Sequence, residues 1–380
     1  MKIDVFEMER FQSAYENEVA INLSESGVKP LRVRDLLEDD EDVSRFLDEK
    51  LGYPVPPGSD RLRERIASWY PGAAPDDVIV TNGGAEANYL ASWTLLEKDA
   101  RLAFMLPNYM QGWGLGRHFA AEADPFRLVP DPDAGRWVLD VDSLREAVGP
   151  TTSALWVCNP NNPTGAVLTS EEMQAIVDAA SEVGAWIISD EIYRGAELEG
   201  DADTPTFWGM YDRVVVTSGL SKAFGLPGLR LGWVVAPPEL IERVWEHRDY
   251  TTIMVGRLSD ELASRALDPA KRQEILGRTR SIVREHIGAV DDWADANKER
   301  VTYLRPRAGA IAFLGYDAPM ESLELADLLR RERSVLVVPG AQLGLDRGFR
   351  VGFGYDAEKT RRGLEQMGEL LRGLVPARSG

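Results

Sequence analysis

The chain has 380 residues, 44% hydrophobic and 28% charged, so it can bury a large core and is neither disordered nor fibrous. A formal net charge of −19 argues against nucleic acid or an anionic membrane as a partner. No apolar run approaches the roughly 20 residues of a membrane span. No signal-like segment is visible and Cys158 is the single cysteine, so we expect a cytoplasmic protein without disulfides. The three histidines are widely spaced, which does not favour a metal site.

Short apolar runs alternate with amphipathic helical patterns in the middle of the chain. In chain order, the predicted strands are Asp77–Thr81, Arg101–Met105, Ala154–Cys158, Ala185–Ser189, Arg213–Thr217 and Leu231–Val235. Such uniformly apolar runs are typical of strands covered on both faces. The clearest helix is Ser170–Val183, with a capping box from Thr169 and Glu172 and a stop at Gly184. This alternation predicts an α/β fold with a mostly parallel sheet and helices on both sides.

The pattern changes after about Pro269. The predicted elements there are one long helix or two helices at Lys271–Asn297, strands at Val301–Leu304 and Ala310–Leu314, a helix at Glu321–Arg333, strands at Val335–Val338 and Arg350–Phe353, and a final helix at Asp356–Leu374. This order indicates a small α+β domain. We therefore predict an N-terminal arm that joins the small domain (1–45), a large cofactor-binding domain (46–270) and the small C-terminal domain (271–380).

Two motifs follow the first predicted strands. The turn Thr81–Asn88, which contains Gly84 and Ala85, lies between a strand and a predicted helix. Glycines at a helix start let backbone N–H groups approach an anion, so the turn predicts a phosphate cradle. A plain strand-to-helix turn would use the same residues. Tyr109 follows the next strand and could stack on a flat heterocycle or simply pack in the core.

Two more motifs follow apolar strands further along the chain. Asn159–Gly165 reads Asn-Pro-Asn-Asn-Pro-Thr-Gly, a rigid turn that can aim an amide side chain at a phenolate oxygen. Asp190 lies at the C-terminal end of its strand, where an anion can keep a pyridine nitrogen protonated, and Tyr193 follows three residues later. The alternative for Asn159–Gly165 is a loop whose residues only form the turn itself. The alternative for Asp190 is an acidic cap at the end of a strand.

Three basic residues complete the pattern. Lys222 follows the apolar run Val214–Val216 and sits among small residues, with Arg230 eight positions later. That arrangement suits a lysine that forms an imine with an aldehyde cofactor while the arginine holds the cofactor's phosphate. Arg350 lies in a β run, where a guanidinium can bind a carboxylate through paired hydrogen bonds. The alternatives are a surface lysine and a solvent-facing arginine on an edge strand.

In this order, the motifs resemble the class I/II aminotransferases of the fold-type I family, which use pyridoxal 5′-phosphate (PLP). The resemblance covers roughly residues 50–355. It implies a large domain with a mostly parallel seven-stranded sheet in an αβα sandwich, and a small α+β domain. It also implies that Lys222 carries the internal aldimine and acts as the proton-transfer base. The other implied roles are Asp190 at the pyridinium, Asn162 and Tyr193 at the ring oxygen, Tyr109 on the ring face, Gly84, Ala85 and Arg230 at the phosphate, and Arg350 with Asn162 at the substrate.

The same resemblance carries three further implications. Tyr53 looks like the tyrosine that reaches the phosphate of the neighbouring subunit, which implies a homodimer with a shared active site. The family commonly has Ser three residues before the lysine, where this chain has Gly219, so Ser218 is the candidate substitute. The segment Asn22–Val28, which lies over the substrate in relatives and makes Gly27 a candidate substrate contact, is similar to that of capreomycidine synthase, a PLP enzyme that cyclises rather than transaminates.

The predicted function is therefore a PLP-dependent aminotransferase that moves an amino group from an L-amino acid to a 2-oxo acid through Lys222. The alternative is a PLP-dependent lyase or cyclase that acts on an amino-acid side chain, because both classes share the early steps. The motifs do not separate these two outcomes.

Overall fold

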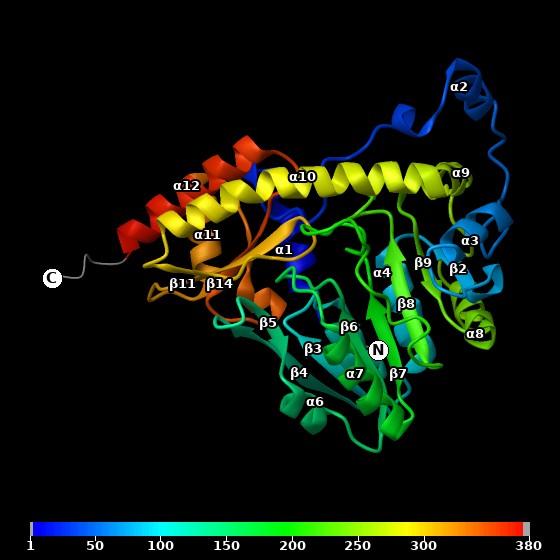
Figure 1. The fold of residues 1–380 in the computed structure, drawn as a ribbon, viewed down its shortest axis with the longest axis horizontal. Coiled ribbons are helices and arrows are strands. Elements are labelled where there is room, and N and C mark those ends of the chain that lie inside the picture. Colours follow the sequence, from blue (N-terminus) through cyan, green and yellow to red (C-terminus); the bar gives the residue numbers. More distant parts are fainter. Residues whose placement is uncertain (1–2, 375–380) are drawn as a thin grey trace.

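The structure, a computed structural model, describes residues 3–374 and is built around one large sheet (Figure 1). Its eight strands have the order β2-β9-β8-β7-β6-β3-β4-β5. In that order they are Val78–Thr81, Gly232–Val235, Val214–Gly219, Trp186–Asp190, Thr152–Cys158, Arg101–Leu106, Glu122–Asp131 and Arg136–Leu139. The pairs from β8 to β4 are parallel, whereas β9 runs antiparallel to both of its neighbours and β5 runs antiparallel to β4. The sheet is therefore mostly parallel, as expected.

All six strands predicted for this sheet are present, with ends within two residues of the predicted ones. The sheet has eight strands rather than the expected seven. β4 and β5 form an antiparallel hairpin at its edge. β4 is largely half-buried or exposed and contains Pro125 and Pro130, so it lacks the continuous apolar run that reveals the inner strands.

Helices cover both faces of the large sheet. One face packs against α4 (Gly84–Leu95), α5 (Gln111–Phe119) and α8 (Pro238–Arg248). The other face packs against α3 (Asp60–Ala67), α6 (Val141–Ala147), α7 (Ser170–Val183), α9 (Arg257–Ala266) and the start of α10 (Pro269–Ala296). Neighbouring strand residues contribute to opposite faces, because side chains alternate along a strand.

The helix α7 has the predicted bounds, and its cap has the predicted form. Thr169 Oγ1 accepts a hydrogen bond from Glu172 N–H (3.2 Å), and Glu172 accepts one from Thr169 N–H (2.8 Å). Gly184 ends the helix with φ +69°, a backbone conformation that favours glycine.

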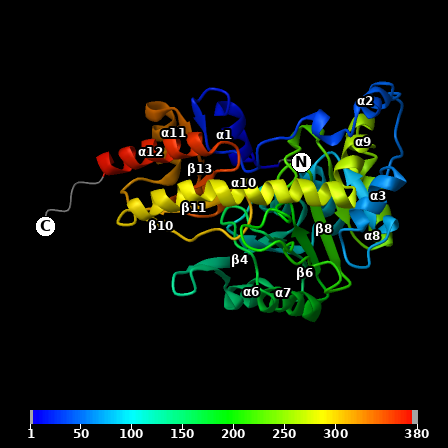
Figure 2. The ribbon, with the colours of Figure 1, turned by 45° about the horizontal axis from the view of Figure 1, so that its top comes forward.

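A second, smaller antiparallel sheet has the order β10-β11-β14-β13 (Figure 2). Its strands are Val301–Tyr303, Ile311–Tyr316, Gly348–Gly352 and Val338–Pro339. Its core includes residues of α10, α11 (Ser322–Arg333) and α12 (Ala357–Leu374). The long helix α10 runs along both parts of the molecule, with Leu276 in the core beside the large sheet and Val283 in the core of the small one.

The N-terminal segment is tied to the small sheet region by backbone pairing. It contains α1 (Glu7–Tyr15) and β1 (Ile21–Asn22), which pairs in parallel with β12 (Val335–Leu336). Gly352 N–H also donates to the carbonyl of Leu23 (2.7 Å). These pairings bring the residues after β1 to the wall of the cavity described below.

The chain between the arm and α3 forms the short turn η1 (Val33–Leu36) and the helix α2 (Asp40–Leu47), which lies at the periphery in Figure 1. The acidic run that precedes and opens α2 serves as its start, since Asp39 accepts a hydrogen bond from Asp42 N–H (2.8 Å). Within residues 3–374, no helix is both long and apolar enough to cross a membrane.

Candidate active site

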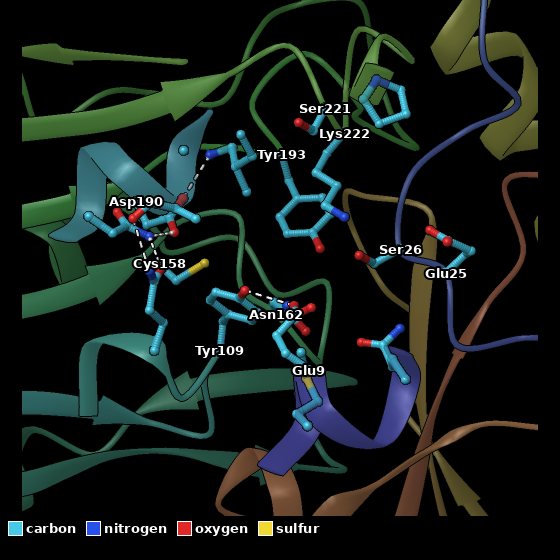
Figure 3. A pocket seen from close by; sticks show the side chains of 18 of the residues that line it. Glu9, Glu25, Ser26, Tyr109, Cys158, Asn162, Asp190, Tyr193, Ser221 and Lys222 are labelled. Atoms are coloured by element: carbon cyan, nitrogen blue, oxygen red, sulfur yellow. Dashed lines mark hydrogen bonds between the residues drawn. The ribbon is translucent and has the colours of Figure 1, made fainter. Parts of the chain in front are cut away.

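A cavity of about 450 Å³ lies where the C-terminal ends of the parallel strands meet the N-terminal arm and the small sheet (Figure 3). Sites for small molecules commonly occupy this edge of an α/β sheet. The predicted site residues that line it are Gly84, Ala85, Tyr109, Asn162, Asp190, Tyr193, Lys222, Arg230 and Arg350. The fold thus gathers residues from positions 84 to 350 of the chain around one space.

Asp190 is held at the end of β7 by two hydrogen bonds. Asn88 Nδ2 donates to its Oδ2 (3.1 Å), and Ile192 N–H donates to its Oδ1 (3.1 Å). Thr217 in turn donates to Asn88 Oδ1 (2.6 Å), which fixes the orientation of that amide. Burial raises the pKa of Asp190, and the two hydrogen bonds oppose this rise. A buried carboxylate with little positive charge beside it suits a cationic ring nitrogen.

Lys222 follows β8, and its Nζ points into the cavity (Figure 3). Burial lowers the pKa of its ammonium group. The charges of Arg350 and Arg230 lower it further, whereas those of Glu25 and Glu9 raise it. An amine with a lowered pKa is deprotonated more of the time, as a nucleophile or a base must be.

Arg230 and the start of α4 form the wall that suits a phosphate. Arg230 Nη1 donates to Ser221 Oγ (3.3 Å), and Gly84 opens the helix α4 beside it. A Cβ on Gly83 would lie 2.6 Å from Arg230 Nη2, and Gly83 has φ +88°. The glycine therefore lets the guanidinium lie directly against the helix start. Free backbone N–H groups, a hydroxyl and a guanidinium form a donor set that matches a phosphate.

Arg350 is a buried guanidinium without a carboxylate partner. Its side chain comes from β14, and the residue is 1% exposed. Nη1 donates to Asn162 Oδ1 (3.1 Å), Nη2 donates to the carbonyl of Ser24 (2.6 Å), and Nε has no hydrogen-bond partner. Among residues 3–374 no acidic side chain lies within ion-pair distance of it. A charge buried in this way suits a carboxylate from outside the chain.

Two tyrosines complete the walls. Tyr109 donates its hydroxyl to Glu9 Oε1 (2.8 Å), and its ring packs edge-on against Phe6. Tyr193 lies close to Lys222 in the cavity (Figure 3). Burial raises the pKa of both phenols above the ordinary value, so both stay neutral donors.

Ser218 is not brought to the cavity, although it was the expected substitute for the family's serine. Its hydroxyl donates to the carbonyl of Glu191 (3.2 Å) in the interior, and Ser221 instead places a hydroxyl beside Arg230 in the cavity wall. A Cβ on Gly219 would lie 2.9 Å from the carbonyl oxygen of Leu231. The close approach of β9 therefore requires glycine at the position where the family commonly has serine.

Two other predicted residues lie outside the cavity lining. Tyr53 is 93% exposed, and its contact with a neighbouring subunit stays a prediction. Gly27 packs behind Lys222: a Cβ there would lie 3.1 Å from the carbonyl oxygen of Ser221 and 3.7 Å from Lys222 Cα. Its neighbours Glu25 and Ser26 line the cavity instead.

Sequence reasoning missed much of the wall formed by the arm. The unpredicted lining residues include Glu9, Gln12, Glu16, Glu25, Ser26, Asn88, Cys158 and Ser221. Those of the arm come from α1, from the turn after it and from the segment after β1, and local patterns there show only an amphipathic helix and a loop. Asn88 could have been found, because it ends the glycine motif one helical turn after Gly84, on the face of α4 that meets the sheet.

Known proteins are similar to this chain in sequence and in fold. The family model described as "Aminotransferase class I and II" matches residues 22–367. Capreomycidine synthase from Streptomyces vinaceus is 29% identical over 317 residues, which cover 83% of this chain and 79% of that protein. The crystal structure of a PLP-dependent aminotransferase from Streptococcus suis 89-1591 has a TM-score of 0.91 and 31% identity, with all of both chains covered.

A third similar protein is the PLP-dependent cyclase OrfR, whose crystal structure has a TM-score of 0.87 and 28% identity and covers 99% of each chain. The predicted resemblance is thus confirmed for the fold, the family and the cofactor. The chain belongs to the class I and II aminotransferase family, PLP-dependent proteins of fold type I.

Proposed function

We propose that the protein is an aminotransferase that moves an amino group from an L-amino acid to a 2-oxo acid, with Lys222 as the essential amine. The observation that carries this proposal is the meeting of Lys222, Asp190 and Arg350 in one cavity. They supply a partly deprotonated amine, an anion for a ring nitrogen and a cation for a carboxylate.

The residues of the cavity fit PLP. Bound there, PLP supplies an electrophilic aldehyde carbon and a ring that withdraws electrons from it. Asp190 would hold the proton on the ring nitrogen. Arg230, Ser221 and the first N–H groups of α4 would hold the phosphate. The remaining ring contacts would come from Asn162 and Tyr193 at the ring oxygen and from Tyr109 on the ring face.

Arg350 and Lys222 would then orient and deprotonate the amino acid. Paired hydrogen bonds from Arg350 to the α-carboxylate fix the direction of the Cα–H bond. Lys222 Nζ would take the α-proton of the bound amino acid and hold it for the later return step. General-base work of this type contributes about 10²- to 10⁴-fold in rate. Asp190 would keep the ring nitrogen of bound PLP protonated while Lys222 moves the proton.

We also propose an oligomeric state, a division into domains and a location for the protein. The first is a homodimer with Tyr53 at the phosphate of the neighbouring subunit; the strong exposure of Tyr53, Leu51 and Tyr250 supports such an interface. The second is the division into arm, large domain and small domain at residues 45 and 270. The third is a cytoplasmic location, which rests on the single cysteine.

The second candidate function is a PLP-dependent cyclase or lyase. The similarity to capreomycidine synthase and to the cyclase OrfR favours it. Both functions use the same amine and the same ring contacts, and they differ in the fate of the substrate after the α-proton has left. The cavity residues described above serve either outcome.

The test has two parts. Borohydride reduction of the PLP-loaded protein, followed by peptide mapping, should place the label on Lys222, and Lys222→Ala should lose both the label and turnover. Label on another lysine, or wild-type turnover by Lys222→Ala, would refute the assignment. Product analysis then separates the two functions: a 2-oxo acid formed for each amine accepted supports the aminotransferase, whereas a cyclic product or ammonia release without an amino acceptor supports the second candidate.

A further inference from the structure

Three carboxylates of the N-terminal segment, Glu9, Glu16 and Glu25, line the cavity and are called the acidic wall below. They come from α1, from the residue after it and from the segment after β1. Figure 3 shows Glu25 and Ser26 on the side of the cavity opposite Asp190, with Lys222 between the two sides. The acidic wall is therefore separate from the anion that faces the ring nitrogen.

The acidic wall has no cationic partner among residues 3–374. In the part of the chain that the structure describes, none of its three carboxylates lies within ion-pair distance of a lysine, arginine or histidine. Glu9 accepts a hydrogen bond from Tyr109 (2.8 Å), which positions it without neutralising it. The pKa of Glu16 is raised, first by burial and then by the charges of Glu25 and Glu9. The three carboxylates thus repel one another across a space large enough for a ligand.

The cations of the cavity have other roles under the proposed function, on which this inference rests. Arg230 faces the phosphate, Lys222 works as a neutral amine, and Arg350 receives the α-carboxylate. Arg350 is independent evidence for a ligand here, because its guanidinium is buried and its Nε has no partner. None of the three is left to neutralise the acidic wall once cofactor and substrate are bound.

The position of Arg350 also indicates the direction in which the substrate's side chain points. Arg350 Nη2 donates to the carbonyl of Ser24 (2.6 Å), and Glu25 is the next residue. An amino acid anchored by its carboxylate at Arg350, with its α-carbon within reach of Lys222, has the acidic wall beside it. A side chain that leaves the α-carbon away from the cofactor ring meets those carboxylates.

We propose that the preferred amino donor is an amino acid whose side chain ends in a cation, a guanidinium or an ammonium group, which the acidic wall binds. A cationic end group relieves the repulsion among the three carboxylates and forms charge-assisted hydrogen bonds with them. An anionic side chain is repelled. A neutral side chain of the same shape leaves the carboxylates uncompensated.

The first test compares two donors of nearly equal shape on the PLP-loaded enzyme. L-Arginine and L-citrulline differ in that one ends in a charged guanidinium and the other in a neutral ureido group. The measurement is kcat/KM from the absorbance change of the cofactor in single half-reactions. We expect L-arginine to exceed L-citrulline by about tenfold or more, the effect of one charge-assisted contact, and L-glutamate to be poorer than both. Equal values, or a preference for L-citrulline or L-glutamate, overturn the inference.

The second test uses charge-neutral variants of the acidic wall. In Glu25→Gln and Glu16→Gln, the ratio of kcat/KM for L-arginine to that for L-citrulline should fall by about tenfold. Glu18→Gln is the matched control, since Glu18 is exposed, lies in the same turn as Glu16 and does not line the cavity. It should keep the wild-type ratio. A ratio unchanged in both wall variants, or lowered equally in the control, contradicts the proposal.

A binding readout separates this inference from the proposed function. Calorimetry on PLP-loaded Lys222→Ala should show L-arginine bound about tenfold more tightly than L-citrulline; equal binding overturns the inference. If borohydride fails to label Lys222, the proposed function falls and this inference falls with it. If Lys222 is labelled but the two donors bind and react equally, only the substrate class is wrong.

Discussion

Asn88 donates a hydrogen bond from Nδ2 to Asp190 Oδ2 across 3.1 Å, between two buried side chains. Thr217 on β8 orients the amide by donating to its Oδ1 (2.6 Å). One helix and two strands therefore determine how the carboxylate presents itself to the cavity. Asn88 acts through Asp190 and is a positioning residue in the proposed mechanism.

Asn88→Asp should impair the enzyme with little change in shape. A second carboxylate beside Asp190 raises the pKa of the pair, so kcat/KM should fall about tenfold or more and the acidic limb of its pH profile should move upward. Ser92→Ala is the control, because it removes a buried hydrogen bond from the same helix without touching Asp190. It should lower stability and leave the pH profile in place. An unshifted profile in Asn88→Asp would contradict the positioning role.

Gly83→Ala should weaken cofactor binding. The new Cβ would lie 2.6 Å from Arg230 Nη2, so the guanidinium must leave the phosphate wall. We expect the Kd for PLP, measured by fluorescence titration, to rise about tenfold or more. Gly72→Ala is the matched control: Gly72 also has a positive φ (+74°), but nothing lies within 4 Å of its added Cβ. Both variants should lose about 1–3 kcal/mol of stability from backbone strain, and an equal loss of PLP affinity in both would refute the argument.

Restoring the family's serine with Gly219→Ser should harm the protein rather than improve it. The Cβ would lie 2.9 Å from the carbonyl oxygen of Leu231 and 3.1 Å from Gly232 Cα, and backbone atoms of a central strand cannot move away cheaply. We expect a loss of about 1–3 kcal/mol in urea unfolding and no gain in PLP affinity. Gly228→Ser, at a position with nothing within 4 Å, should be nearly neutral. Tighter PLP binding by Gly219→Ser would contradict this prediction, because it would show that β9 can move to admit the serine.

Glu191 should make stability depend on pH. Burial raises its pKa to about 7 from the ordinary value of 4.5, which applies to the unfolded chain, and its Oε2 has no hydrogen-bond partner. The native state thus holds the proton to higher pH than the unfolded state. Stability from this group is present below about pH 4.5 and is lost as the pH rises through 7, by up to about 1.4 kcal/mol per pH unit. Glu191→Gln should remove this slope, because glutamine does not ionise. In urea unfolding, the free energy of unfolding of the variant relative to that of the wild type should therefore be higher at pH 8 than at pH 5. A difference that is the same at both pH values would be evidence against ionisation of Glu191.

The cofactor side of the cavity could be predicted because its residues obey local rules. Asp190 and Lys222 follow uniformly apolar strands, and parallel strands bring their C-terminal ends to one edge. Gly84 opens a helix directly after a strand, which places its N–H groups at the same edge. The position of each of these residues can be predicted from the types of its immediate sequence neighbours.

The substrate side could not be predicted in the same way. Glu25 reaches the cavity because β1 pairs with β12 and Leu23 pairs with Gly352, contacts that span more than 300 residues. Ser218 and Ser221 could not be told apart, because the backbone turns directly after β8 and so ends the alternation along the strand. β4 and β5 were missed because the two strands of this edge hairpin are largely half-buried or exposed and have no continuous run of buried apolar residues.

The parallel pairing of the arm with β12 places the acidic wall on a segment that is physically distinct from the sheet carrying Asp190 and Lys222. Under the proposals made above, one segment of the chain therefore determines which amino donor is preferred, and other segments carry out the chemistry on it. A chimera that exchanges only residues 3–28 for those of a relative would transplant selectivity while the catalytic half stays untouched. Under these proposals, substitutions confined to a short N-terminal segment are enough to change the preferred amino donor.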